Sequence, residues 1–438
     1  MSTIYFNNFR GFDNTFLHLK DVNFFIGENS TGKTSILKLI GIMSSQNFWR
    51  YGEFGKEEIS FGAFENIVTS SKDNKDYFEV GVYENNLEKE GAFSAIKLTY
   101  IEKDTLPFLK EICYKNNALN IQSVIEGKQI KYRFKLEETS IIQANKEIIS
   151  WFKDNGLDNE IFNRTESQYI GIASILSQLS TQIKELNSFT IDLPSFANRL
   201  AWIAPVRAEP KSIYRQGGDI YDSGGRHSPS VLKEINLSPI VKHILNRFGS
   251  DSGLFEDIYT KDLVDAKILE NIENMDDIDR KQAIKKSDTF EIRVTINGES
   301  RNIVNVGYGV SQILPIIIEA IARPDNTWFA AQQPEVHLHP KAQAAFGDFV
   351  FKSNHVDNQK FIIETHSDYI IDRYRLRLNR ASKEKAKAKI GQVVFFYKKE
   401  NGNKLDVIPF NSDGSYFEQQ PKEFRDFFIK EQLDLITI

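Results

Sequence analysis

The segment at residues 27–34, Gly-Glu-Asn-Ser-Thr-Gly-Lys-Thr, constrains the fold of this chain more than any other feature. It matches the pattern G-x-x-x-x-G-K-[ST], which binds phosphate only when it lies between a buried strand and a helix. The apolar run at residues 22–26 is typical of a buried strand, and residues 35–43 have the apolar spacing of a helix. Both flanks therefore favour a phosphate-binding loop over a chance glycine-rich turn.

The geometry of such a loop predicts a role for each of its polar groups. The backbone N–H groups of residues 28–33 point toward the β-phosphate of a nucleotide, and the N-terminus of the following helix adds positive potential. Lys33 is expected to bridge the β and γ oxygens, and the Thr34 hydroxyl to ligate Mg²⁺. The residues expected to hold ATP and Mg²⁺ in this loop are Gly27, Asn29, Ser30, Thr31, Gly32, Lys33, Thr34 and Ser35.

Composition narrows the class of protein. The chain has 438 residues, of which 41% are hydrophobic, so it can bury a sizeable core in one large head with an insertion or in two domains. A single cysteine, Cys113, excludes a disulfide framework and favours a reducing, cytoplasmic setting. No apolar stretch reaches the roughly 18 residues of a membrane span, so we expect no membrane contact. With 55 basic and 60 acidic residues, the net charge is −5, and any nucleic-acid contact requires a local patch.

The pattern of the chain divides it into three segments. Residues 1–137 begin with short strands, the loop and its helix, and continue with alternating strands typical of an antiparallel sheet. Residues 138–288 have mainly helical spacing and are interpreted as an insertion. Residues 289–438 alternate strands and helices again, which predicts that they complete the α/β head begun by residues 1–137.

A second candidate phosphate site lies at residues 305–315. Gly307, Gly309 and Ser311 precede or begin an apolar helix. Glycines permit close backbone approach, and a serine hydroxyl can cap the helix and donate a hydrogen bond, so this entry forms another anion cradle. A second phosphate-facing helix, distant in sequence from the first loop, is what a dimer that sandwiches ATP requires.

Two further apolar strands end in polar residues. Residues 327–331 lead into Gln332, Gln333 and Glu335, and residues 360–363 lead into a segment that contains His366. Open α/β sheets bind their ligands at such strand ends. Four of the seven histidines fall within residues 337–366, which raises a metal site as an alternative, although their spacing matches no common zinc-ligand pattern.

These motifs occur in the order found in the ABC-type ATPase heads of the SMC and RecF class, and more narrowly the chain resembles the OLD-like AAA-family ATPases of bacterial anti-phage systems. The resemblance covers the head and implies an α/β fold with a mixed central sheet, an antiparallel β subdomain and a helical insertion. In that family the loop at residues 27–34 is the Walker A motif, and residues 305–312 resemble a degenerate signature motif. Its Gly309 and Ser311 would reach the γ-phosphate held by the opposite subunit.

The resemblance also assigns the remaining motifs. Residues 327–335 resemble the Walker B strand, and residues 337–340 the D-loop region. His366 resembles the switch histidine that senses the γ-phosphate, and Arg10 resembles an early basic residue that such heads place near the nucleotide.

The chain departs from most ABC heads at the end of the Walker B strand. Two acids are usual there, one in the Mg²⁺ shell and one that polarises the attacking water, whereas this chain has Gln332 and Gln333. A neutral amide can orient a water but cannot accept its proton. Glu335 can supply the carboxylate, the glutamine can be a Glu-to-Gln substitution introduced to trap ATP, or the chain can be a slow, nucleotide-gated binding module. The candidate catalytic residues are Glu335, Gln333 and His366, with Thr34 and Gln332 as candidate metal ligands.

The resemblance further implies partners. The ATPases of Septu and PARIS systems are similar in being separate subunits that hold a toxic effector from another gene. It therefore implies an ATPase subunit that forms head-to-tail dimers or higher oligomers, senses DNA or a phage product, and controls a nuclease or toxin encoded by a neighbouring gene. A non-hydrolysing, ATP-locked scaffold and a RecF-like DNA repair ATPase are the alternatives.

A basic cluster follows His366. Eight lysines and arginines lie within residues 373–389. They could contact the phosphates of DNA, or they could be the solvated face of a helix, and the sequence favours neither.

Overall fold

The computed structural model describes residues 2–55, 59–69, 75–86, 91–158, 160–167, 171–183, 194–197, 199–217, 221–235, 238–263, 288–386, 388–417 and 420–426. The chain forms two compact units. Unit 1 consists of Met1–Leu200, Gly391–Pro409 and Phe417–Ile438, and unit 2 consists of Ala201–Ile390 and Phe410–Tyr416. Both units therefore combine segments that are distant in the sequence.

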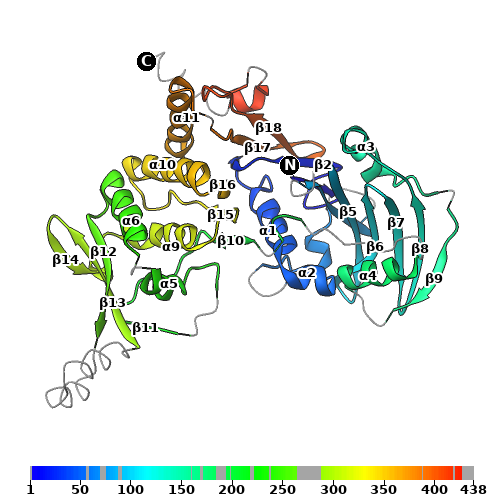
Figure 1. Ribbon diagram of the computed structural model, residues 1–438, viewed down its shortest axis with the longest axis horizontal. Coiled ribbons are helices and arrows are strands. Elements are labelled where there is room, and N and C mark those ends of the chain that lie inside the picture. Colours follow the sequence, from blue (N-terminus) through cyan, green and yellow to red (C-terminus); the bar gives the residue numbers. More distant parts are fainter. Residues whose placement is uncertain are drawn as a thin grey trace. The chain divides into compact units, whose positions relative to one another are not determined.

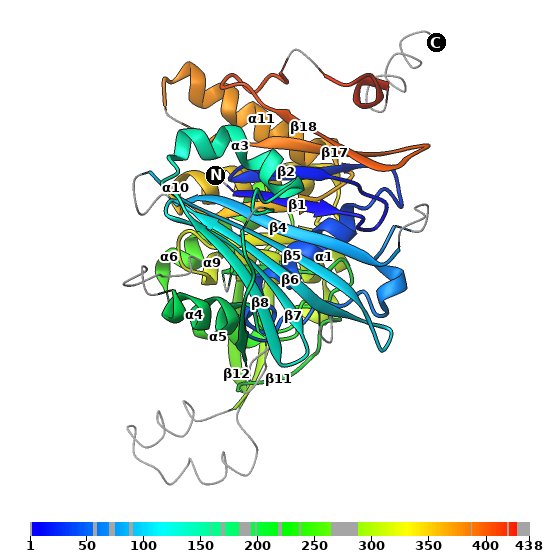
Figure 2. The same ribbon diagram turned by 90° about the vertical axis from the view of Figure 1, so that its right-hand side faces the viewer.

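An antiparallel sheet dominates unit 1. Its strands lie in the order β2-β1-β4-β5-β6-β7-β8-β9, which can be followed in Figures 1 and 2. Adjacent strands are mostly sequential hairpins, as the alternating sequence pattern predicts. The strands are β1 (Ser2–Asn7), β2 (Thr15–Leu19), β4 (Tyr77–Asn86), β5 (Ala92–Lys103), β6 (Leu106–Asn116), β7 (Leu119–Glu126), β8 (Gln129–Leu136) and β9 (Asn163–Glu166).

Helix α3 (Ile141–Lys153) packs on this sheet. It begins at Ser140, whose side chain accepts a hydrogen bond from the backbone of Gln143 and so satisfies a free N–H of the first turn. Trp151 and Phe152 join Tyr5 in a buried cluster, with the Tyr5 and Phe152 rings stacked at 4.7 Å. The apolar stripe of α3 thus covers the inner face of the first strands.

A smaller group of strands in unit 1 carries the phosphate-binding loop. Strand β3 (Val22–Gly27) pairs in parallel with β17 (Gln392–Lys399), and β17 pairs antiparallel with β18 (Gly402–Pro409). These three strands are separate from the antiparallel sheet described above and have mixed directions. Helix α1 (Lys33–Ser44) follows the loop. Helix α2 (Gln46–Tyr51) comes next and packs on α4 (Ile172–Gln182).

Unit 2 has a parallel core of its own. Strands β10 (Leu200–Ile203), β15 (Trp328–Gln332) and β16 (Lys360–Glu364) lie in that order, and β15 and β16 are buried throughout except at Lys360. Strands that are buried on both faces are continuous apolar runs, and the sequence predicts β15 and β16 from such runs. The accompanying helices are α9 (Tyr308–Ala322), α10 (Pro340–Val356) and α11 (Asp368–Lys383), and α10 packs on α11 and on α6 (Pro239–Ser252).

A second, antiparallel sheet in unit 2 lies in the order β11-β13-β12, and β14 pairs with β13. Its strands are β11 (Tyr214–Arg215), β12 (Asp257–Leu263), β13 (Thr289–Ile296) and β14 (Glu299–Asn302). Helix α5 (Ser228–Ile235) packs on β11, β12 and α9.

The predicted fold class, α/β with a mixed sheet, an antiparallel β part and an inserted helical region, is confirmed. The region at residues 138–288 also contains strands β9, β10, β11 and β12. Local spacing does not reveal these strands, because they pair with strands in other segments of the chain. The units divide the chain at residues 200–201, inside that region, so the boundaries at 137 and 288 stay predictions. None of the described helices combines the length and apolarity that crossing a bilayer demands.

The α3 cluster predicts that Phe152→Ala destabilises unit 1 by about 3–5 kcal/mol, since removing a fully buried ring loses its burial and leaves a cavity. Ile149→Ala, in the same helix but 47% exposed, is the matched control and should change stability by less than about 0.5 kcal/mol. Urea denaturation measures both. Equal effects of the two substitutions would mean that the α3 face is assigned wrongly.

Candidate functional site

The phosphate-binding loop has the backbone geometry that its sequence predicts. It runs from the end of β3 to the start of α1, and Gly32, the residue before the helix, has φ 96°. Lys33 is buried, and its Nζ donates hydrogen bonds to the carbonyl oxygens of Gly27 (2.7 Å) and Glu28 (2.6 Å). The ammonium is therefore held over the loop, beside the backbone amides that open the helix.

The other predicted loop residues surround Lys33. Thr31 is buried and its hydroxyl donates to the carbonyl of Glu28 at 2.8 Å, which closes the loop on itself. Ser30 has φ 63° and, like Asn29 and Thr34, is exposed. Exposed side chains beside a helix N-terminus suit contacts with an anion and its metal. The eight predicted residues thus lie at the end of β3, in the loop and in the first turn of α1.

Arg10 lies beside this loop, as the resemblance implies. Its Nε donates to Ser35 Oγ at 3.3 Å, and Nη1 donates to the carbonyl of Asn66 at 2.6 Å. The turn that carries Arg10 is fixed by Asn403, whose side chain donates to the Arg10 carbonyl at 2.8 Å. The exposed guanidinium is therefore oriented from both sides next to the first turn of α1.

In unit 2, the predicted signature motif meets the predicted D-loop region. A Cβ on Gly309 would lie 2.7 Å from the carbonyl oxygen of His337, so only glycine permits this approach. The rings of Tyr308 and His337 are also in contact, edge to face at 4.8 Å. Ser311 lies one turn further along α9, and its hydroxyl donates to the Tyr308 carbonyl at 2.8 Å.

The ends of β15 and β16 bring Gln332 together with a carboxylate that sequence analysis did not assign. Gln332 and Glu364 are register partners, and Gln332 Nε2 donates to Glu364 Oε2 at 2.7 Å. Both side chains are buried. A glutamate at position 332 would bring two buried carboxylates together, which is unfavourable, whereas the amide is a donor that suits Glu364. Glu364 was detectable only as an acid at the end of an apolar strand.

Glu335 is anchored rather than loose. Its Oε1 accepts a hydrogen bond from the backbone N–H of His366 at 2.7 Å, and its Oε2 accepts from the Thr365 hydroxyl at 2.8 Å. Each carboxylate oxygen has further lone pairs for a water or a metal. The structure therefore places the candidate base Glu335 directly beside the candidate sensor His366. Gln333 lies in the same turn with φ 44°, and its backbone N–H donates to the Glu364 carbonyl at 2.7 Å.

Arg207 completes this edge and was not predicted as a site residue. Its Nη2 donates to the carbonyl oxygens of Gln332 (2.7 Å) and Gln333 (3.2 Å). Its Nε and Nη1 are buried without a hydrogen-bond partner among the described residues. Burial lowers the pKa of Arg207 to about 10, and the nearby Glu335 carboxylate opposes this shift. A buried cation with two unused donors is costly unless an anion joins it, so Arg207 is a candidate phosphate ligand.

The basic cluster is largely engaged within unit 2. Arg373 and Arg377 both pair with Asp348, the latter at 2.5 Å. Arg375 pairs with Asp372 and lies over the ring of Tyr416. Such contacts favour a helix face tied to its own unit, while Lys387 lies outside the described residues.

Metal-binding clusters of three or more His, Cys, Asp or Glu side chains are absent from the part of the chain that the structure describes. His339 instead caps α10, where its side chain accepts a hydrogen bond from the backbone of Ala342. The histidines at 337, 339 and 366 thus have separate positions rather than a shared one.

Comparison with known proteins identifies one family. The family described as AAA ATPase domain matches residues 1–371, which is most of the chain. No curated protein matches the sequence.

Among solved structures, the SMC head domain from Thermotoga maritima is 10% identical, with 93% of this chain and 98% of that chain covered and a TM-score of 0.38. The Smc head domain from Pyrococcus furiosus, solved with the C-terminal domain of ScpA, is 8% identical, with 100% and 99% covered and a TM-score of 0.41. The recombination mediator protein RecF is 12% identical, with 90% and 95% covered and a TM-score of 0.30. At these scores the similarities carry no inference about activity.

The geometry of the loop predicts that Lys33→Ala abolishes nucleotide binding, with a loss of at least about 100-fold in affinity for ATP, because charge-assisted hydrogen bonds to phosphate are lost. Lys103→Ala, an exposed lysine of β5, is the matched control and should bind ATP as the parent does. Isothermal titration measures both affinities. Normal ATP binding by Lys33→Ala would show that the loop is assigned wrongly.

Proposed function

The chain belongs to the AAA ATPase domain family, and from this premise we propose that it binds and hydrolyses ATP with Mg²⁺ as one subunit of an anti-phage defence complex. The observation that carries the ATP-binding part is the loop between β3 and α1, in which Lys33 Nζ is held by two loop carbonyls beside the helix N-terminus. Thr34 is the proposed Mg²⁺ ligand, and Mg²⁺ would neutralise charge that develops on the phosphates.

We place the hydrolytic groups at the ends of β15 and β16. Glu335 is the proposed base, since its carboxylate is fixed by Thr365 and His366 and keeps lone pairs for a water. His366 is the proposed sensor of the γ-phosphate, and Arg207 a proposed contact to it. Gln333 is proposed to orient the water, because an amide can do so without accepting the proton.

The buried pair of Gln332 and Glu364 changes which residue is expected to supply the carboxylate near the metal. Gln332 is bonded to Glu364, so the carboxylate that accompanies the metal at this edge is proposed to be Glu364 rather than residue 332. This arrangement supports an enzyme in which Glu335 and Glu364 replace the two acids that are usual at the positions of Gln332 and Gln333. The competing hypothesis is an ATP-locked scaffold that does not hydrolyse ATP. It is favoured if Glu364 only accepts the hydrogen bond from the Gln332 amide and takes no part in metal binding.

The two hypotheses differ in what happens to bound ATP. We expect Glu335→Gln to lower phosphate release by at least about 100-fold while ATP remains bound, since the proton acceptor is lost and the phosphate ligands are not. Phosphate release and retained nucleotide are measured on the same sample with Mg²⁺ and labelled ATP. Glu299→Gln, an exposed acid on β14, is the control and should leave turnover unchanged.

Release that continues unchanged in Glu335→Gln would remove Glu335 from the chemistry. Tightly retained ATP without release in the parent protein would support the scaffold instead.

We propose that ATP joins two copies head to tail, with Gly309 and Ser311 of one copy facing the γ-phosphate bound by its partner. Both residues lie in the first turns of α9, near the helix N-terminus, whose positive potential attracts an anion. DNA or a phage product would then be sensed through dimer closure, and a nuclease or toxin from a neighbouring gene would be the controlled partner. Preference for gapped DNA without such an effector would favour a RecF-like repair role.

This arrangement predicts that Ser311→Arg prevents ATP-driven dimerisation, because a long cation replaces a small hydroxyl in the first turns of α9. Light scattering with and without ATP measures the mass of the particle. Ser250→Arg, an exposed serine near the end of α6, is the control and should dimerise normally. Retained ATP binding by Ser311→Arg would demonstrate that the variant is folded, and dimerisation by this folded variant would contradict the proposed interface.

A further inference from the structure

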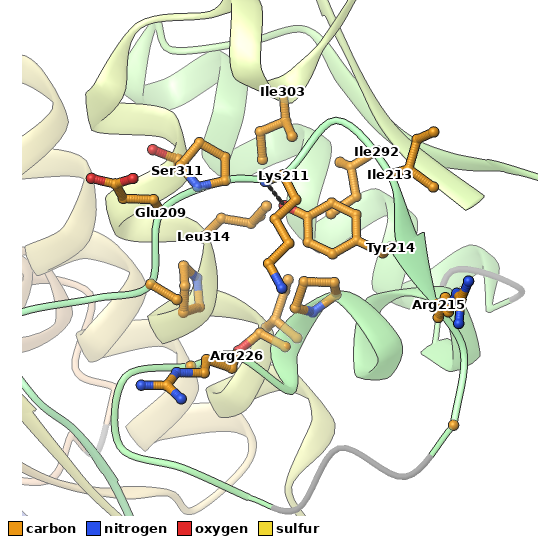
Figure 3. A pocket seen from close by; sticks show the side chains of 18 residues that line it. Glu209, Lys211, Ile213, Tyr214, Arg215, Arg226, Ile292, Ile303, Ser311 and Leu314 are labelled. Atoms are coloured by element: carbon orange, nitrogen blue, oxygen red, sulfur yellow. Dashed lines mark hydrogen bonds between the residues drawn. The ribbon is translucent and has the colours of Figure 1, made fainter. Parts of the chain in front are cut away.

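Unit 2 contains a cavity of about 420 Å³, and Ser311 of the proposed signature motif forms part of its lining. Its walls come from the loop before β11, the start of α5, strand β13 and helix α9 (Figure 3). The volume lies within the roughly 300–1,000 Å³ of pockets that bind small molecules. The lining combines a cationic part with an apolar part, which suggests a ligand with two chemically different ends.

Three cations line the cavity against one acid. Lys211, Arg215 and Arg226 are all exposed side chains, and none of them forms an ion pair within the described residues. Glu209 is the single acidic residue among the described residues of the lining, which therefore carry a formal charge of +2. Figure 3 shows Lys211 extending across the middle of the cavity, with Arg226 and Arg215 on opposite sides of it. Cations that line a cavity without an ion-pair partner favour an anionic ligand.

The start of α5 adds a second, independent feature. Ser228, the first residue of the helix, lines the cavity and is only 1% exposed. Its hydroxyl has no hydrogen-bond partner among the described residues. A buried hydroxyl without a partner is costly, and an anion in the cavity would accept a hydrogen bond from it.

Apart from Ser311, most of the remaining lining is apolar. Tyr214 closes one side, and its phenol oxygen accepts a hydrogen bond from the Lys211 backbone at 2.8 Å, which holds the loop against β11. The aliphatic lining residues are Ile213, Ile292, Ile303, Leu314 and Ile318. A ring or a similar apolar body would lose contact with water against these side chains.

The segment that carries Arg226 is firmly held. His227, between Arg226 and Ser228, contacts Glu319 of α9 through Nε2 and Oε1 at 2.6 Å. Glu319 is buried and also accepts hydrogen bonds from Arg323 at 2.7 and 3.0 Å. The backbone of this segment is thus positioned by buried hydrogen bonds before a ligand binds.

We propose that this cavity binds a phosphorylated small molecule with an aromatic or other apolar body. The phosphate contacts Lys211, Arg226 and the Ser228 hydroxyl at the start of α5. The apolar body packs on Tyr214, Ile303 and Leu314. Because Ser311 and Leu314 belong to α9, occupancy would also bias the helix that carries the proposed signature motif, a consequence that rests on the proposed function.

The test measures binding directly and does not depend on ATP turnover. Phenyl phosphate, AMP and inorganic phosphate are titrated calorimetrically into the full chain that carries Lys33→Ala, so that the phosphate loop does not contribute. We expect phenyl phosphate or AMP to bind at least about 10-fold more tightly than inorganic phosphate, because the apolar body adds burial. In the same background, Lys211→Ala with Arg226→Ala should weaken that binding at least about 10-fold.

Two further variants keep the test decisive. Lys261→Ala with Arg301→Ala removes two exposed cations from β12 and β14 and should leave binding unchanged. Ser228→Ala should weaken binding of the phosphate while circular dichroism shows a folded chain.

Equal affinity of the Lys211 and Arg226 double variant and its parent would overturn the proposal. Equal affinity for inorganic phosphate and phenyl phosphate would overturn the assignment of an organic ligand. Failure of ATP binding or dimerisation in the other experiments would leave these results unaffected, so the two proposals fail separately.

Discussion

The close approach of β3 and β17 is the constraint on which the nucleotide site depends. A Cβ on Gly27, which has φ 141°, would lie 1.9 Å from the carbonyl oxygen of Phe396, so glycine is required both for the turn and for the parallel pairing. Gln392, at the other end of the pairing, donates to Asn23 Oδ1 at 2.8 Å. Residues near the C-terminal end of the chain therefore fix the strand from which the phosphate-binding loop begins. The same C-terminal hairpin fixes the Arg10 turn through Asn403, so loop and cation share one support.

A second constraint acts at the ends of β15 and β16, where buried charge must be compensated. Glu364 accepts a hydrogen bond from Gln332, and Arg207 Nη2 donates to the carbonyl oxygens of residues 332 and 333. An acid at position 332 would place two buried carboxylates side by side, and they would repel each other. The Gln332 amide instead donates a hydrogen bond to Glu364. The chemistry of this edge is therefore better described by its pairs than by a comparison of single positions with other ATPases.

Features of the fold and the site that are encoded by adjacent residues could be predicted from the sequence, whereas features made by tertiary contacts could not. The strand, loop and helix around Lys33 are encoded by adjacent residues, and the structure has them where the pattern predicts. The polar ends of β15 and β16 were also visible, since apolar runs mark buried strands. Arg207 and Glu364 were not assigned roles, because an isolated arginine or glutamate acquires one only when tertiary contacts bury it. The cavity was invisible for the same reason, as Lys211, Arg226 and Ser228 converge with α9 only in the fold.

Helix α9 connects several of these features within unit 2. Gly309 in its first turn contacts the carbonyl of His337, Leu314 lines the cavity, and Glu319 holds the segment that carries Arg226. A displacement of this helix would alter all three contacts together, since packed interiors do not deform continuously. Differential binding to two positions of α9 is what a ligand in the cavity would need to influence the signature motif. The buried network around Glu319 is the physical link by which the segment that carries Arg226 and the helix would move together.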